Sequence, residues 1–236
     1  MNGNRKLVSL MLLLFCASLF LMGTAVAEST APTQEKLIAL TFDDGPNGEC
    51  TGKLLDALKE HDARATFFLV GTNIERNKEL VQRMIDEGHE VGSHSWSHQD
   101  MITLSESEIT AELEQADDAI YEAIDSYPTL FRAPYGSIND LLLEQLDVPS
   151  IYWSVDTKDW KTLDQDDVRT HILDRAYDGA IILLHDVLET TVNGTIAALQ
   201  ELKAKGYTLV TVSELLSRNG DLLEAGVTYY ECKPPR

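Results

Sequence analysis

Two adjacent carboxylates, Asp43 and Asp44, are the first residues in this sequence whose types could do chemistry. They follow a strand-like stretch, 37–42, and precede a Gly-Pro pair through which a strand cannot continue. Neighbouring carboxylates repel each other, so a desolvated pair needs a cation or a shared proton. The alternative is a surface turn, which Asp-Asp-Gly-Pro also suits. A chemical role therefore depends on partner residues elsewhere in the chain.

Two histidines, His94 and His98, stand four residues apart. If this segment turns helically after its strand, both rings point the same way, at the spacing of metal-binding histidine pairs. With Asp43 or Asp44 as a third ligand, two imidazoles and a carboxylate leave an open position for water, as in catalytic zinc sites. The metal would lower the pKa of that water towards ~7. The alternative is a pair of exposed or capping histidines.

The elements that must position these residues alternate along the chain. We expect strands at 37–42, 66–71, 90–92, 129–132, 150–154, 180–185 and 208–210, and helices at 51–60, 77–87, 105–124, 139–145, 166–177 and 195–205. Ser105 and Glu108 form a capping box, whereas Gly88 and Gly206 stand where helices end. Seven strands alternating with helices predict one α/β domain with parallel pairing, either a barrel or a doubly wound sheet.

The polar residues that do not suit this scaffold all stand at strand ends. In a β/α barrel those ends face one side, where such folds carry their sites. The residues are Asp43 and Asp44 after the first strand, His94 and His98 after the third, Arg132 at the fourth, Asp156 and Asp159 after the fifth, and His185 at the sixth.

Five segments in this order resemble the motifs of the polysaccharide deacetylases, the NodB-homology or carbohydrate esterase family 4 proteins. They are Thr41-Phe42-Asp43-Asp44-Gly45, His94-Ser95-Trp96-Ser97-His98, Arg132-Ala133-Pro134-Tyr135, Asp156-Thr157-Lys158-Asp159-Trp160 and Leu183-Leu184-His185. The resemblance implies a distorted (β/α)7 barrel that removes acetyl groups, usually from N-acetylglucosamine units of a glycan. It also implies one divalent metal ion, for which zinc is our expectation and cobalt or another divalent ion the alternative.

The resemblance also implies a role for each motif residue. Asp43 resembles the general base, and Arg132 resembles the residue that holds it. Asp44, His94 and His98 resemble the metal ligands, and the Tyr135 N–H resembles an oxyanion donor. His185 resembles the general acid with Asp159 as its partner, and Trp160 and Leu183 resemble the walls of an acetyl pocket. Base and acid must hold opposite protonation states at one pH, so we expect Asp43 to be ionised and Asp159 to raise the pKa of His185. We expect Lys158 to point to solvent.

The start of the chain reads as a secretory signal peptide over 1–27. Arg5 and Lys6 precede an apolar run, and Ala25-Val26-Ala27 is a small-residue cleavage site. The alternative is a transmembrane anchor. We expect a short leader at 28–35, the catalytic domain at 36–218 and a C-terminal tail at 219–236.

The charge balance is strongly acidic. Arg5 and Lys6 are two of the 19 basic residues, whereas all 39 acidic residues lie downstream, so cleavage moves the net charge from -20 to -22. Nucleic acid is a poor partner for such a surface. Cys50 and Cys232 would remain after cleavage, and in an oxidising exported setting a disulfide between them is one prediction, two free thiols the other.

The sequence therefore predicts an exported, metal-dependent N-deacetylase, secreted or associated with the cell wall. Its expected substrate is peptidoglycan N-acetylglucosamine, with chitin-type oligomers next. An O-acetyl esterase on acetylxylan and a catalytically silent glycan-binding protein of the same fold are the alternatives. We expect a monomer with no stable membrane anchor after signal cleavage.

Overall fold

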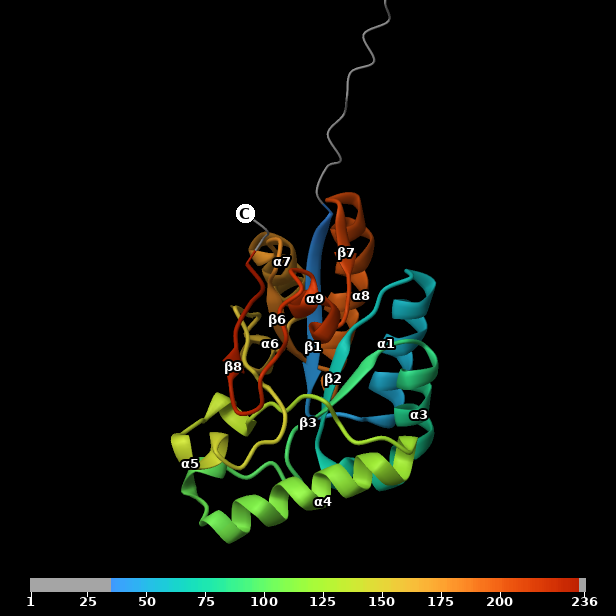
Figure 1. Cartoon of the computed structure of the whole chain (residues 1–236). Helices are drawn as coiled ribbons and strands as arrows, with labels where there is room; N and C mark the ends of the chain where they lie inside the picture. The colour runs from blue at the N-terminus through green and yellow to red at the C-terminus, as the bar shows by residue number, and fades with distance from the viewer. Residues whose placement is uncertain (1–34, 234–236) are drawn as a thin grey trace, which may run out of the picture. The chain divides into compact units, whose positions relative to one another are not determined.

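A ring of parallel strands forms the centre of the molecule in the computed structural model, which describes residues 35–233 (Figure 1). The strands are β1 (Lys36–Asp43), β2 (Thr66–Leu69), β3 (Glu90–Ser93), β4 (Ser150–Ile151), β5 (Val155–Asp156), β6 (Ile181–His185), β7 (Tyr207–Leu209) and β8 (Thr228–Tyr229). Pairings between these strands are all parallel. The carboxyl ends of β1, β2, β3 and β6 therefore share one side of the ring, the lower side in Figure 1, whereas β8 runs upward towards the C-terminus.

The ring is closed but irregular. Its main sheet runs in the order β3-β2-β1-β6-β5, with β7 paired to the start of β1. Phe131 bridges Ser93, at the end of β3, to Ser150 of β4. Because β4 and β5 belong to one stretch, 150–156, this bridge closes the ring. The α/β barrel expected from the sequence is confirmed, and it is distorted where the fourth expected strand shrinks to one bridging residue.

Helices follow the strands and cover the outside of the ring. They are α1 (Gly48–Glu60), α2 (Gly71–Ile74), α3 (Lys78–Asp86), α4 (Glu106–Ile124), α5 (Asp140–Leu143), α6 (Asp159–Thr162), α7 (Gln165–Arg175), α8 (Glu189–Ala204) and α9 (Val212–Ser217), with 3-10 turns at Glu75–Asn77, Met101–Thr103 and Pro134–Gly136. The capping box that begins α4 is present, because Glu108 Oε2 accepts the Ser105 N–H at 2.8 Å. Helices α2, α6 and α9 were not predicted.

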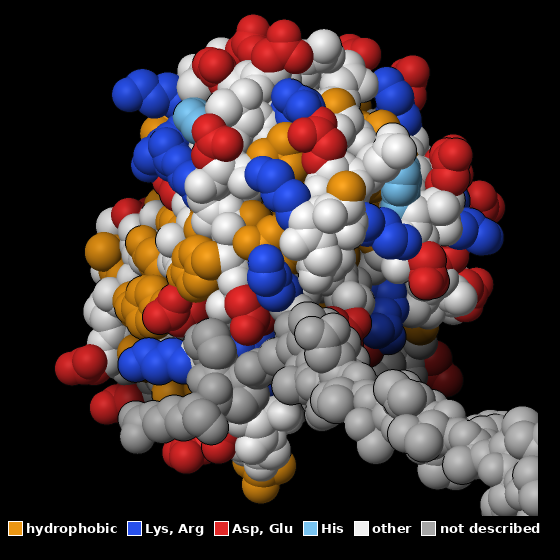
Figure 2. All heavy atoms as spheres, turned by 90° about the horizontal axis from the view of Figure 1, so that it is seen from above, with side chains coloured by type: hydrophobic (Ala, Val, Ile, Leu, Met, Phe, Trp, Pro, Cys, Tyr) orange, Lys and Arg blue, Asp and Glu red, His pale blue; other side chains and the backbone are white. Residues whose placement is uncertain are grey.

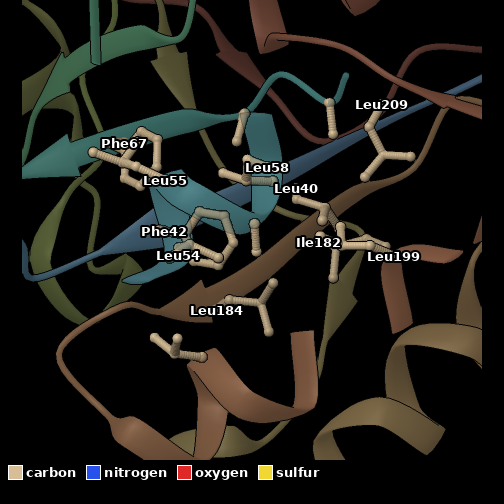
Figure 3. Packing of buried hydrophobic residues seen from close by; sticks show 14 of the residues in the cluster. Leu40, Phe42, Leu54, Leu55, Leu58, Phe67, Ile182, Leu184, Leu199 and Leu209 are labelled. Atoms are coloured by element: carbon tan, nitrogen blue, oxygen red, sulfur yellow. The ribbon is translucent and has the colours of Figure 1, made fainter. Parts of the chain in front are cut away.

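Strand β1 divides its side chains between two environments. Leu40 and Phe42 pack outward against Leu54, Leu55 and Leu58 of α1 (Figure 3), in a buried cluster that also takes residues from β2, β6 and α8. Thr41 and Asp43 point the other way, into the ring, where both contact Arg132. Alternation along the strand thus anchors β1 from outside while it turns Asp43 inward.

The segment after residue 218 belongs to the barrel rather than forming a simple tail. Strand β8 pairs with β4, where Thr228 stands opposite Ser150 and Tyr229 opposite Ile151. Further along, the Cys232 N–H donates to the Gly179 carbonyl oxygen at 2.9 Å. The C-terminal segment therefore continues the hydrogen-bonded structure as far as residue 232.

Of the two alternatives for Cys50 and Cys232, the structure shows two free thiols and no disulfide between them. Cys50 lies in α1, in the electrostatic environment of Asp186, which follows the end of β6. Cys232 contacts Gly179, which precedes the start of β6. The two thiols thus lie near opposite ends of a five-residue strand, which spans roughly 16 Å at about 3.3 Å per residue. That separation exceeds the reach of a disulfide.

Two expectations concern the ends of the chain. The expected signal peptide, 1–27, and nearly all of the expected leader lie outside the described residues. Within residues 35–233, no helix combines the length and apolar character needed to cross a membrane. On the face at the amino ends of the strands, acidic and basic side chains are interspersed (Figure 2), so neighbouring charges of opposite sign partly offset one another there.

Candidate active site

Asp44, His94 and His98 meet at the carboxyl ends of β1 and β3. One ligand atom from each lies within 4.8 Å of the others. Asp44 Oδ1 lies 3.6 Å from His94 Nε2 and 3.1 Å from His98 Nε2. The structure therefore brings together the three residues that the sequence predicted as metal ligands.

The local conformation that achieves this is not the helical turn that we predicted. The segment 94–98 is a loop, and Ser95 and His98 have left-handed backbone angles, with φ of 64° and 60°. The two rings nevertheless meet, with centroids 5.0 Å apart. The spacing of four residues correctly predicted that the two histidine rings meet. It did not predict the conformation of the backbone between them.

The three residues fit a divalent cation. The His94 Nδ1 lies 2.6 Å from the Arg132 carbonyl oxygen, which can only accept, so Nδ1 carries the proton and Nε2 offers its lone pair. Burial lowers the pKa of His94, which keeps the ring neutral. Burial acts to raise the pKa of Asp44, but the His98 hydrogen bond and nearby histidine charges lower it to about 2. Asp44 Oδ1 therefore points at the two ring nitrogens, 3.6 Å from His94 Nε2 and 3.1 Å from His98 Nε2. Two imidazole nitrogens and one carboxylate suit a catalytic metal centre.

Asp43 is held by a buried guanidinium. Arg132 Nη1 donates to Asp43 Oδ1 at 2.7 Å and to Thr41 Oγ1 at 2.8 Å. The remaining nitrogens of Arg132 donate to the carbonyl oxygens of Ile151 and Tyr152. Asp43 Oδ2 lies 3.8 Å from His94 Nε2, so one oxygen of Asp43 is fixed by Arg132 while the other faces the proposed metal ligands.

His185 and Asp159 form a second buried pair. The Asp159 Oδ1 lies 3.0 Å from His185 Nδ1, and Asp159 Oδ2 accepts the His185 N–H at 2.8 Å and the Thr191 hydroxyl at 2.9 Å. Burial acts to lower the pKa of His185, but the hydrogen bond and charge of Asp159 raise it to about 9. The ring is therefore protonated at neutral pH, as predicted.

A cavity of about 590 Å³ joins these groups. The motifs assign roles to ten residues, of which Arg132 and Asp159 are fully buried. The other eight line the cavity: Asp43, Asp44, His94, His98, Tyr135, Trp160, Leu183 and His185. Tyr135 reaches this position with a left-handed backbone, φ 60°. Its ring is exposed and meets the His98 ring with centroids 4.7 Å apart.

Sequence reasoning missed several lining residues. Tyr152 and Trp153 stack on one another beside the cavity, and adjacent aromatics within an expected strand were the only signal for them. Lys158 is exposed, as expected, and it also lines the cavity. Its ammonium pairs with Asp156 at 2.5 Å and lies over the Trp160 ring.

Asp186 is a further buried carboxyl group to which the sequence assigned no role. It accepts a hydrogen bond from the Thr51 hydroxyl, and a Cβ atom on Gly45 would stand 2.5 Å from its Oδ1. Burial raises its pKa to about 7, and the charges of Asp44 and Asp43 act in the same direction. Asp186 therefore packs directly under the turn that follows Asp44, which requires glycine there.

Comparisons with known proteins agree with this geometry. Residues 30–148 match the family model described as polysaccharide deacetylase. The chain is 40% identical over 206 residues to the peptidoglycan-N-acetylglucosamine deacetylase PgdA of Listeria monocytogenes, covering 87% of this chain and 44% of that protein. It is 42% identical over 189 residues to the peptidoglycan-N-acetylmuramic acid deacetylase PdaC of Bacillus subtilis, covering 80% and 40%. The chain thus spans less than half the length of these two relatives.

A solved structure extends the comparison to the whole barrel. A family 4 acetyl xylan esterase from Clostridium thermocellum, in complex with a cobalt ion, superposes with a TM-score of 0.79 at 30% identity. The match covers 83% of this chain and 98% of that one.

Proposed function

Because this chain belongs to the polysaccharide deacetylase family, we propose that it is an exported, metal-dependent hydrolase that removes N-acetyl groups from a glycan. The observation that carries the proposal is the register between β1 and β6, which sets Asp43 directly opposite His185. A held carboxylate and a protonated imidazole thereby flank the Asp44-His94-His98 cluster, as hydrolysis by a base and an acid requires.

Asp44, His94 and His98 would hold the metal. When bound, a divalent ion supplies an activated water and polarises the acetyl carbonyl. Zinc is our proposal for this ion, because two histidines and a carboxylate are a common zinc set. The similarity to an esterase in complex with a cobalt ion supports a divalent ion as the cofactor.

Asp43 is the proposed general base. Arg132 occupies Oδ1, so Oδ2 is the oxygen available to accept a proton from the attacking water. As the water oxygen bonds to the acetyl carbon, its proton passes to Asp43 Oδ2. The fixed guanidinium keeps the carboxylate oriented and charged before the transfer.

His185 is the proposed general acid. Its Nδ1 is held by Asp159, so Nε2 is the nitrogen that donates. When the carbon–nitrogen bond breaks, Nε2 gives its proton to the departing amine, and acetate and a free amino sugar result. Without this proton the amine would be a poor leaving group.

The remaining motif residues suit the acetyl group. We propose that the Tyr135 N–H donates to the developing oxyanion. Leu183 is 4% exposed and Trp160 is 51% exposed at the edge of the same cavity, so together they offer an apolar wall to the acetyl methyl group.

The proposed substrate is peptidoglycan N-acetylglucosamine, with chitin-type oligomers next. The names of the two curated relatives support peptidoglycan, one through N-acetylglucosamine and the other through N-acetylmuramic acid. Action on a wall polymer agrees with the signal peptide predicted at 1–27, and we propose a secreted or wall-associated monomer.

Acetate release tests the proposal. The full chain, treated with chelator and then reloaded with zinc or cobalt, would be incubated with peptidoglycan, chitooligosaccharide and acetylxylan. We expect release from the first two that disappears with chelator and returns with metal. No release from any of the three after reloading would contradict the proposal.

The O-acetyl esterase is the second candidate, and it is favoured by the similarity to the acetyl xylan esterase. Faster turnover of acetylxylan than of either N-acetylated glycan would favour it. A silent glycan-binding protein is disfavoured, because Asp43, Asp44, His94, His98 and His185 are all present around one cavity.

A further inference from the structure

The loop 94–98, which carries two of the proposed metal ligands, is held against two helices. At the start of α2, the N–H groups of Gly71 and Thr72 donate to the carbonyl oxygens of Ser95 and Trp96, each at 3.0 Å. In Figure 1, α4 lies at the lower end of the molecule, on the side to which the strands point. The loop therefore contacts α2 on a side that does not face the cavity.

Glu112 of α4 is the polar contact between that helix and the loop. Its side chain is buried, with the residue 6% exposed. The Oε2 atom accepts the Ser97 N–H at 2.8 Å, while Oε1 accepts the Ser97 hydroxyl at 2.5 Å and Gln99 Nε2 at 3.1 Å. These donors all lie within or next to the loop, so the whole carboxylate is committed to it.

Trp96 packs against Gly71 of α2, which in turn lies against α4. A Cβ atom on Gly71 would stand 2.4 Å from the Trp96 ring and 3.2 Å from the Ala116 Cα. The Trp96 ring therefore contacts Gly71, and Gly71 also approaches the backbone of α4 closely. Glu112 and Ala116 lie on the same face of that helix, four residues apart.

The loop needs such contacts because its backbone is costly. Ser95 and His98, both non-glycine residues, have positive φ, a sparsely populated conformation that costs free energy for such residues. Within the loop, Ser95 Oγ accepts the His98 N–H at 3.0 Å. Surrounding structure must over-determine this path for His94 and His98 to stay together.

We propose that Glu112 is a positioning residue of the metal site: through Ser97, it fixes the loop so that His98 stays beside His94 and Asp44. The inference rests on the proposed function, since it presumes that these three residues bind the metal. Groups outside the ligand shell that orient ligands typically contribute about 10–100-fold to metal affinity. Removal of Glu112 therefore weakens metal binding without removing a ligand.

The test compares metal affinity with stability. The zinc Kd of the full-length protein would be measured by competition with a chromogenic chelator, starting from the metal-free form. The Tm of the same metal-free form would be measured in parallel. We expect Glu112→Ala to raise the zinc Kd about 10–100-fold. Glu112→Gln keeps an acceptor for the Ser97 N–H and a donor for its hydroxyl, so we expect a smaller rise. Acetate release from Glu112→Ala should recover in excess zinc.

The control is Glu114→Ala, which removes an exposed carboxylate from the same helix and should leave the zinc Kd unchanged. If Glu112→Ala does not fold, Ser97→Ala tests the same contact by removing one hydrogen bond, with a severalfold rise in Kd expected. An unchanged Kd in the folded variant, with only a lower Tm, overturns the inference alone. Failure of the wild-type protein to bind zinc or cobalt overturns the proposed function as well.

Discussion

Arg132 Nη1 lies 2.7 Å from Asp43 Oδ1, and the two side chains are 0% and 4% exposed. Both charges are removed from water, so each depends on the other to offset its desolvation. Thr41, Ile151 and Tyr152 accept three further hydrogen bonds from the guanidinium. The pair thus ties β1 and β4 to the segment that carries Arg132, while it orients the proposed base.

Breaking this pair should destabilise the fold. Replacing Arg132 with Met leaves Asp43 buried without its partner, so we expect the free energy of unfolding in urea to fall by about 3–5 kcal/mol. Arg132→Lys should lose most of the same free energy, because one ammonium cannot reproduce the fork of donors. Arg169→Met, which breaks the exposed pair with Glu201, is the control and should cost no more than about 1 kcal/mol. Equal losses for the Arg132 and Arg169 variants would contradict the prediction.

Asp43→Asn should separate catalysis from metal binding. The amide cannot accept the proton of the attacking water, so acetate release should fall about 10²–10⁴-fold. Because Asp44, His94 and His98 are untouched, the zinc Kd should stay close to that of the wild-type protein, whereas Asp44→Ala should weaken zinc binding. Retained acetate release by Asp43→Asn would show that the base is another group.

The pH profile should report the pair of His185 and Asp159. The acid works while protonated, and its pKa of about 9 places the alkaline fall in kcat near that pH. In Asp159→Asn the main charge that raises this pKa is lost, and only the smaller effects of Asp43 and Asp44 still oppose burial. The alkaline limb should then move from about 9 towards the ordinary 6.5. An unmoved limb, measured by acetate release from pH 5 to 10, would exclude His185 as the titrating acid.

Asp186 should make stability depend on pH. Its folded pKa of about 7 exceeds the ordinary 3.8, so between those values the folded chain keeps a proton that the unfolded chain has lost. The free energy of unfolding therefore falls as pH rises through this window and stays lower above it. In the metal-free protein, the free energy of unfolding of Asp186→Asn should lack this fall. The difference in stability between Asp186→Asn and wild type should therefore favour the variant more at pH 8 than at pH 4. Parallel stability curves for the two proteins would refute this assignment.

Gly71→Ala should disturb the ligand loop from its other side. The added methyl group would overlap the Trp96 ring, and overpacking of this kind typically costs about 1–3 kcal/mol. We expect a lower Tm and weaker zinc binding. Gly52→Ala is the matched control, since its Cβ would meet only Leu80 at an ordinary 3.8 Å. A zinc Kd unchanged by Gly71→Ala would show that Trp96 adjusts without moving His94 or His98.

The sequence predicted the barrel and the members of the site because both follow from repeating patterns. Alternation of strands with helices implied parallel pairing, and polar residues at strand ends implied a shared face. Asp44, His94 and His98 could therefore be grouped although they are far apart in the chain.

Features that depend on tertiary contacts escaped prediction. The left-handed angles of Ser95 and His98 replace the helical turn that a spacing of four suggests, and they persist because α2 and α4 hold the loop. Glu112 reads as one of several acidic residues on a long helix, and only the fold shows its contact with Ser97. Cys50 and Cys232 form no disulfide because they lie too far apart, and the sequence does not give the distance between two cysteines.

The pairing of β8 with β4 bears on where this domain can be cut. Tyr229 accepts the Tyr152 N–H through its carbonyl oxygen at 2.7 Å, and the Tyr152 carbonyl oxygen in turn accepts from Arg132. A chain trimmed after residue 218 would keep every motif residue. It would lose β8, however, and with it the hydrogen bond that supports Tyr152, Arg132 and, through Arg132, Asp43. For recombinant work, a safe C-terminal boundary therefore lies beyond Cys232.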